Sequence, residues 1–198
     1  MVIGLTGKYC SGKNYIASLL EKRGLAVLDV DKLGHIAIEN EKSAVFSRFG
    51  EDLRGSDGSV NRRLLGEKVF GKPGELADLE AIAHPEANRL TEEWLAARKD
   101  ENCVINAAVL HKSSVFSRLG CIILARAPLA VRLMRAKKRD SLSWPAIVKR
   151  IASQRHFYSQ YSAGNADIYI VENPGMGKAR AVAALNRRID VILSRLGL

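Results

Sequence analysis

The stretch GKYCSGKN, from Gly7 to Asn14, constrains the fold of this chain more than any other feature. Its glycines and lysine have the spacing of the phosphate-binding pattern GxxxxGK[ST], although Asn14 stands where the pattern has a hydroxyl residue. In such a loop, backbone N–H groups and the positive end of the next helix hold the β-phosphate, and the lysine reaches the β/γ oxygens. We therefore predict that Gly7, Gly12 and Lys13 bind nucleotide phosphates. The residues expected to contribute mainly backbone groups are Lys8, Tyr9, Cys10 and Ser11.

The loop lies between a strand pattern and a helix pattern, as this chemistry requires. Val2–Thr6 is a short apolar run, Tyr15–Arg23 has apolar residues at helical spacing before Gly24, and Leu25–Val30 is a second β-rich run. A strand, helix and strand in this order form a crossover with parallel strands. Further strands are predicted at Cys103–Ala107, Cys121–Leu124 and Ile168–Val171. The predicted fold class is α/β, a three-layer P-loop fold with a mainly parallel sheet.

Two helical segments interrupt this alternation. Residues 33–99 contain no convincing strand and are broken by the turn-forming clusters GSDGS and GKPG. Residues 130–161 are also helical and are interrupted at SLSWP, where Pro145 fits the first turn of a new helix. We predict one kinase-like unit with a core of about 1–32, 100–131 and 162–198. The helical insertion is predicted at about 33–99 and a mobile helical lid at about 132–161.

The basic residues are concentrated in the second helical segment. The chain has 198 residues, 47% of them hydrophobic, and a formal net charge of +10. Between Ile122 and Ala166 the acid is Asp140 alone. Such a block is either a solvated helix face or a surface for an anion, which includes phosphorylated small molecules, nucleic acids and membrane surfaces. The basic residues are Arg126, Arg132, Arg135, Lys137, Lys138, Arg139, Lys149, Arg150 and Arg155.

The first residues of the sequence and its cysteines predict a cytoplasmic protein. The apolar opening MVIGLT lasts a few residues and lacks a basic leader, so we expect neither a signal peptide nor a membrane span. Three cysteines without ligand spacing predict reduced thiols and no structural metal site. Cys10 is either a small spacer in the loop or, beside cationic groups, a thiol of lowered pKa.

Oxygen ligands near the loop predict how magnesium is held. The amide oxygen of Asn14 is a neutral hard ligand, so we expect it to bind Mg²⁺ weakly, directly or through water. Asp29 and Asp31 lie at the carboxyl end of the predicted second strand, where parallel sheets bind ligands. One of them is expected to accept a proton from an attacking hydroxyl or to hold the metal's waters. The alternative is a polar strand end that caps a helix at Lys32.

Five further motifs, in order and spacing, resemble the dephospho-coenzyme A kinase family, P-loop enzymes of the nucleoside-monophosphate-kinase type. VLDVD resembles the family's strand that ends in its catalytic aspartate, at Asp31. With the other four, the resemblance spans nearly the whole length of the chain. They are DGSVNRRLLGEKVF from Asp57 to Phe70, AIAHPE with His84 and Pro85, RAKKRD with KRIASQ through Arg135, Arg139, Arg150 and Gln154, and NADIYIVENPG with Asp167, Asn173 and Gly175.

The resemblance implies ATP and Mg²⁺ as cofactors and dephospho-coenzyme A as the acceptor, phosphorylated on its ribose 3′-hydroxyl. Lys13, Asp31 and Arg139 are then catalytic, with Arg139 closing over the γ-phosphate as an arginine finger in cis. It also implies that the helical insertion binds the acceptor. Arg135 and Arg150 would bind ATP, Asn173 would lie near adenine, and Arg62 and His84 would contact the acceptor. Without the resemblance, His84 before Pro85 is most simply a helix start.

Two departures from the family leave alternatives open. The loop ends in Asn14, and NAAVLHKSS, from Asn106 to Ser114, replaces a run of proline, two leucines and a following glutamate. One alternative is a P-loop kinase for another small hydroxylated or nucleotide substrate. Another is a non-catalytic nucleotide-binding regulator whose basic face binds nucleic acid, although aromatic residues for base stacking are sparse there. We expect a monomer that binds no nucleic acid and no membrane.

Overall fold

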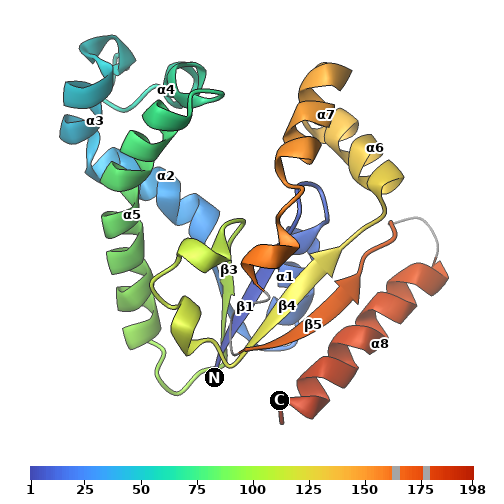
Figure 1. The fold of residues 1–198 in the computed structure, drawn as a ribbon. Helices are drawn as coiled ribbons and strands as arrows, with labels where there is room; N and C mark the ends of the chain where they lie inside the picture. Colours follow the sequence, from blue (N-terminus) through green and yellow to red (C-terminus); the bar gives the residue numbers. More distant parts are fainter. Residues whose placement is uncertain (162–165, 176–178) are drawn as a thin grey trace. The chain divides into compact units, whose positions relative to one another are not determined.

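The core of the structure is one parallel sheet. The computed structural model describes residues 1–161, 166–175 and 179–198. Five strands lie in the order β2-β3-β1-β4-β5, and β1 pairs in parallel with β3 and β4, as β4 does with β5. The predicted α/β class is confirmed (Figure 1). The strands are β1 Val2–Gly7, β2 Ala26–Asp29, β3 Cys103–Asn106, β4 Cys121–Arg126 and β5 Asp167–Glu172.

The chain divides into two compact units, and the first contains the sheet except for Asp29, the last residue of β2. This unit comprises Met1–Leu28 and Asp100–Leu198. Among the described residues, no helix is long and apolar enough to cross a membrane. Pro145 lies in the first turn of a helix, as predicted. The helices of this unit are α1 Lys13–Glu21, α6 Leu129–Arg139, α7 Trp144–Ser153 and α8 Ala179–Arg195, with short 3₁₀ turns at Leu110–Lys112, Phe116–Arg118 and Tyr158–Gln160.

The second unit, Asp29–Lys99, is helical. Its own core joins buried side chains such as Phe46, Leu53 and Leu65. Small residues let α2 and α5 approach closely, because Ala37 packs against Ala83 and Ala87. An isolated antiparallel bridge between Arg54 and Val60 closes the GSDGS turn. The elements are α2 Val30–Asn40, α3 Lys42–Phe49, α4 Arg62–Val69, α5 Pro73–Ala96 and a 3₁₀ turn at Glu51–Leu53.

Two local predictions in this region were wrong. The second strand ends at Asp29, and Val30 already begins α2, so Asp31 lies in the first helical turn and not on the strand. Asp29 is the extended residue before that helix, with φ −89° and ψ 96°. His84 does not begin a helix, because Pro85 lies inside α5. Pro85 has no backbone N–H to donate, and its ring clashes with a carbonyl group of the preceding helical turn. Packing of the helix must offset the free-energy cost of both effects.

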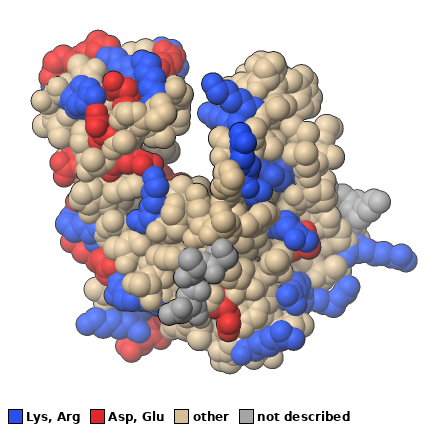
Figure 2. All heavy atoms as spheres, viewed as in Figure 1, with Lys and Arg blue, Asp and Glu red and all other residues tan. Residues whose placement is uncertain are grey.

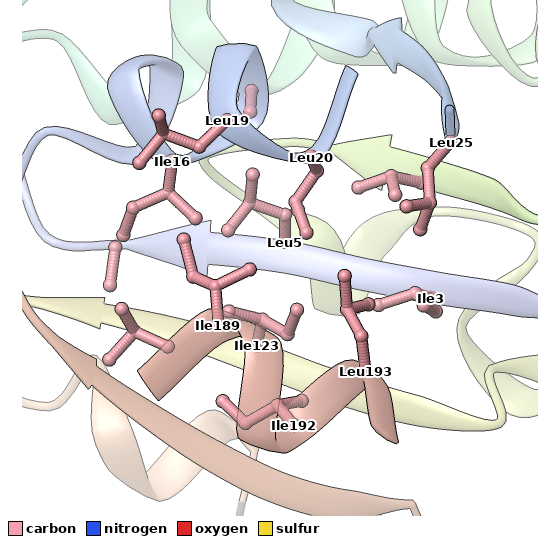
Figure 3. Packing of buried hydrophobic residues seen from close by; sticks show 14 of the residues in the cluster. Ile3, Leu5, Ile16, Leu19, Leu20, Leu25, Ile123, Ile189, Ile192 and Leu193 are labelled. Atoms are coloured by element: carbon pink, nitrogen blue, oxygen red, sulfur yellow. The ribbon is translucent and has the colours of Figure 1, made fainter. Parts of the chain in front are cut away.

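Apolar side chains hold α1 and α8 against the same face of the sheet (Figure 3). Ile3 and Leu5 of β1 alternate with residues that point to the other face, as the two-residue period of a strand requires. Ile16 and Leu20 of α1 pack onto them. The side chains from α8 are Leu185, Ile189, Ile192 and Leu193, which recur at helical spacing. This packing fixes α1, and therefore the loop that precedes it.

We predict that Ile189→Ala destabilises the protein by about 3 kcal/mol, because truncating a fully buried aliphatic side chain leaves a cavity. Urea unfolding monitored by circular dichroism measures this. Val191→Ala on the same helix is the control, since Val191 is 46% exposed and its loss should cost much less. Equal losses for the two variants would contradict this account of the core.

Candidate active site

The loop between β1 and α1 has a curled backbone that demands glycine. Cys10 and Gly12 have left-handed φ values of 60° and 86°. Gly12 precedes α1, and its carbonyl oxygen accepts hydrogen bonds from the N–H groups of Tyr15 and Ile16. A Cβ on Gly12 would lie 2.2 Å from Asn173 Nδ2, and a Cβ on Gly7 would lie 2.4 Å from Ser11 Oγ. Both glycines are therefore required by space, and Gly12 also by its backbone conformation.

Side chains from β5 and α6 satisfy the carbonyl oxygens of the loop. Asn173, buried after the end of β5, donates from Nδ2 to Ser11 O at 3.1 Å. Arg135 donates to Ser11 O at 3.1 Å and to Asn173 Oδ1 at 2.9 Å. Arg132 donates to Tyr9 O at 2.8 Å and is 6% exposed. The structure thus places Arg135 and Asn173 directly on the loop.

Arg132 was not predicted as a site residue, because in the sequence it is one of many cations in the basic block. Its signal was the spacing of Arg132, Arg135 and Arg139, which puts the three on one side of α6. Burial is the main cause that lowers the pKa of Lys8, and the neighbouring Arg132 lowers it further. The loop is therefore surrounded by cationic groups on the α6 side.

Lys13, in the first turn of α1, belongs to a small amide network. Its Nζ donates to Asn106 Oδ1 at 3.0 Å and to Asn14 Oδ1 at 3.2 Å. Asn106 Nδ2 also donates to Asn14 Oδ1, at 3.2 Å. Asn106 is the last residue of β3 and is 1% exposed. Asn106 was not among the predicted site residues, although it begins the unusual segment NAAVLHKSS.

Tyr9 connects the loop to the proposed lid, residues 132–161. Its N–H donates to Gln154 Oε1 at 2.7 Å, and its hydroxyl donates to Asp140. Asp140 also accepts from Arg139 Nε at 2.8 Å, and this bond is the largest cause that lowers the pKa of Asp140. Burial, with the Asp140 bond second, raises the pKa of Tyr9. Arg139 and Arg150 lie over the Tyr9 ring, at 5.1 and 5.8 Å from its centroid.

Cys10 is a packing residue of the loop and does not have the lowered pKa that we considered. Its side chain is buried in a small cluster with Ala136 of α6 and Ile147 of α7. Burial is the largest cause and raises the pKa of the thiol, even though Arg139 acts in the opposite direction. The alternative of a reactive thiolate at this position is therefore wrong.

The remaining predicted site residues lie in the helical unit Asp29–Lys99. Asp31 is exposed in the first turn of α2, and Arg62 is exposed at the start of α4. Asn61 caps α4, because its side chain accepts a hydrogen bond from Leu64 N at 3.2 Å. His84 is half-buried on α5. The roles of these three side chains remain proposals.

The charge around the loop is cationic, whereas no acidic metal cluster is present in the described residues. Figure 2 shows Lys and Arg side chains along the α6–α7 part of the first unit. The described ranges contain no group of three or more His, Cys, Asp or Glu side chains that could hold a metal ion. The arrangement can therefore bind a polyanion through backbone N–H groups, Lys13 and arginines.

Comparison with known proteins identifies the family. The family model for dephospho-CoA kinase matches residues 1–176. The chain belongs to the dephospho-CoA kinase family. A dephospho-CoA kinase of Treponema pallidum is 33% identical, over 99% of this chain and 95% of its own. One from Thermus thermophilus is 31% identical, over 99% and 92%.

Solved structures agree with the fold of this dephospho-CoA kinase family member. The crystal structure of TT1252 from Thermus thermophilus superposes with a TM-score of 0.80 at 31% identity, covering 99% of this chain and 97% of that one. Shikimate kinase from Bacteroides thetaiotaomicron, at 13% identity, has a TM-score of 0.52 and covers 98% of both chains. The second likeness concerns the fold alone.

We predict that Gly12→Ala raises the dissociation constant for ADP by at least about tenfold. A loss of about 1.4 kcal/mol of binding free energy, caused by distortion of the loop, is enough for this change. The physical reason is the contact that a Cβ would make with Asn173, added to a left-handed φ. Isothermal titration measures the affinity. Gly24→Ala is a matched control, because Gly24 has φ 85° but nothing within 4 Å of a Cβ. It should cost about 1 kcal/mol of stability and leave ADP affinity unchanged. Undiminished ADP binding by Gly12→Ala would refute the assignment of the loop.

Proposed function

We propose that this chain transfers the γ-phosphoryl group of ATP to the ribose 3′-hydroxyl of dephospho-coenzyme A, which gives coenzyme A and ADP. The observation that carries the proposal is the glycine loop with Lys13, lined by arginines of α6, in a chain that the family model matches over residues 1–176. The bond between the γ-phosphorus and its bridging oxygen breaks, a new bond to the 3′-oxygen forms, and the hydroxyl proton is released. The same reaction is the final step of coenzyme A biosynthesis.

On this proposal the nucleotide is held by the loop. Backbone N–H groups of Gly7 to Asn14 surround the β-phosphate, and Lys13 reaches the β/γ oxygens. Arg139 leaves Asp140 and stabilises the charge that spreads over the transferring group, as an arginine finger does. Arg150, at the edge of the same cluster, binds the nucleotide phosphates. Arg135 and Asn173 keep the loop in shape, and the turn after Asn173 lies near adenine.

The acceptor is proposed to bind to the helical unit Asp29–Lys99. Asp31 orients the 3′-hydroxyl or accepts its proton. Arg62 offers a bidentate fork for a phosphate group, and His84 contacts the phosphates or the pantetheine arm. The exposed position of Asp31 and Arg62 at helix starts supports these roles, because neither side chain is buried in the core.

The residues around Lys13 fit a magnesium nucleotide. Asn14 and Asn106 direct two amide oxygens toward one cationic group, the Lys13 ammonium. Hard neutral oxygens of this kind are ligands that Mg²⁺ accepts alongside water and phosphate. When bound, the ion neutralises charge on the β- and γ-phosphates. Asn14 is then the residue of the loop that tunes magnesium affinity.

A coupled ADP-release assay tests the acceptor. ADP formation with dephospho-coenzyme A, much faster than with adenosine, shikimate or other small hydroxylated substrates, is the expected result. Asp31→Asn should remove most of the activity and leave ATP binding intact. Faster turnover of another acceptor would support a different kinase of the same fold. Absence of ATP turnover, together with RNA or DNA binding that depends steeply on salt, would instead support a non-catalytic nucleotide-binding regulator.

We predict that Arg139→Ala lowers kcat by about a thousandfold and ATP affinity by less than about tenfold, because a finger acts mainly on the transition state. Steady-state kinetics and ATP titration measure the two quantities. Lys138→Ala is the matched control, since Lys138 is an exposed neighbour on α6 and carries the same charge. A large loss of affinity with an unchanged kcat would refute the assignment of Arg139.

A further inference from the structure

Three consecutive side chains of the glycine loop, those of Lys8, Tyr9 and Cys10, contact the lid, residues 132–161. Lys8 Nζ lies over the Tyr158 ring, 4.3 Å from its centroid. Cys10 is buried in a cluster with side chains of α6 and α7, and Tyr9 packs against the same cluster. Phosphate binding by such a loop uses mainly the backbone at these positions. Their side chains can therefore serve a second purpose, which is to seat the lid.

Every polar group of Tyr9 bonds to the lid. Its N–H donates to Gln154 Oε1 at 2.7 Å, its carbonyl oxygen accepts from Arg132 Nε at 2.8 Å, and its hydroxyl donates to Asp140. Arg132 belongs to α6, Asp140 follows α6, and Gln154 follows α7. The two backbone bonds fix the main chain of this residue against the lid. The ring and the hydroxyl therefore project from a defined place.

The hydroxyl of Tyr9 and two arginines meet at the carboxylate of Asp140. Arg139 donates to this carboxylate from Nε at 2.8 Å and from Nη2 at 3.2 Å. Arg150 Nη1 lies 3.7 Å from it. Both guanidinium groups also lie over the Tyr9 ring, at 5.1 and 5.8 Å from its centroid. One side chain of the loop thus contacts the carboxylate and both cations that the carboxylate attracts.

We propose that Tyr9 is a positioning residue that keeps Arg139 poised beside the phosphate loop, from where Arg139 reaches the nucleotide. Tyr9 acts through its hydroxyl bond to Asp140 and through its ring, on which the guanidinium group lies. A phenol holds the carboxylate by donating a proton and adds no negative charge of its own. Arg139 is then oriented by the same short loop whose backbone holds the phosphates. The inference rests on the proposed function in taking Arg139 as the group that acts on the transferring phosphoryl group.

The first experiment follows Arg139 directly, in the whole chain and without an acceptor. Nitrogen-15 NMR measures the exchange of the Arg139 Nε–H with solvent, and the signal is identified by its loss in Arg139→Lys. Tyr9→Phe keeps the ring and removes only the hydroxyl, so Asp140 loses one anchor. We expect the exchange to become about fivefold faster, the effect of one hydrogen bond. Tyr9→Leu also removes the ring and should have a larger effect.

The second experiment measures kinetics and ATP affinity. An arginine that is held less firmly must lose more conformational freedom in the transition state, so Tyr9→Phe should lower kcat about fivefold. The dissociation constant for ATP should stay within about twofold of the parent value, because the loop backbone is unchanged. In an Arg139→Ala background, the same substitution should change kcat by less than about twofold, since its effect passes through Arg139.

Two further variants keep the test decisive. Asp140→Asn retains the shape of the side chain but removes its charge, so it should also speed the exchange of Arg139 Nε–H and lower kcat. Tyr169→Phe is the matched control, because Tyr169 lies on β5 and packs against the core cluster under α1 and α8. It should leave the exchange, kcat and ATP affinity unchanged. Thermal unfolding of each variant establishes that it is folded.

The outcomes separate this role of Tyr9 from the proposed function. Unchanged exchange of Arg139 Nε–H in folded Tyr9→Phe would overturn the role, and so would a loss of kcat that persists without Arg139. Either result leaves the kinase assignment intact if the parent phosphorylates dephospho-coenzyme A. Faster exchange in Tyr9→Phe, with a parent that does not phosphorylate this acceptor, would sink the proposed function and leave the placement of Arg139 by Tyr9 standing.

Discussion

Gly12 carries the constraint on which the rest of the site depends. Its backbone is left-handed, and Asn173 Nδ2 occupies the space where a side chain would begin. Asn173 is itself fixed by a backbone bond to Arg126 O at 2.7 Å, at the ends of β4 and β5. The curl of the loop is thus tied to the sheet on two sides, through Gly7 of β1 and through Asn173. Because α1 and α8 pack on the sheet through buried aliphatic residues, the rigidity of the core reaches the backbone of the loop.

The sequence was most informative about features that a short contiguous segment determines, such as the strands and the glycine loop. Each of the five strands was predicted within two residues, because buried parallel strands are continuous apolar runs bounded by polar or glycine residues. The loop was equally accessible, since its residues are contiguous. Asn106 was not, because it lies 93 residues from Lys13, and only the pairing of β3 with β1 brings the two together. Arg132 was not predicted for another reason. The sequence of a basic helix does not distinguish a buried arginine from a solvated one.

The local errors have a common physical origin, which is that packing overrides propensity. In VLDVD, the β-branched valines and the alternation of apolar and acidic residues favour an extended chain through Asp31. The strand nevertheless ends at Asp29, and Val30 begins α2. Pro85 would ordinarily end a helix at a cost of about 3 kcal/mol. In α5 the neighbouring Ala83 and Ala87 are buried against Ala37 of α2, and continuing the helix keeps these contacts. The cost of a single proline is offset when the turns on both sides of it are packed.

The pairing of Arg139 with Asp140 suits the role that we propose for Arg139, in which it leaves the acid and reaches the nucleotide. A permanently solvated arginine would have to lose much of its conformational freedom when nucleotide binds. Asp140 and the Tyr9 ring already restrict Arg139, although its side chain remains 61% exposed. An exposed ion pair contributes at most about 1 kcal/mol, whereas a triphosphate offers several negative charges at once. The acid therefore orients the arginine without competing seriously for it. Because Tyr9 also donates to Asp140, the conformation of the loop and the orientation of Arg139 depend on the same carboxylate.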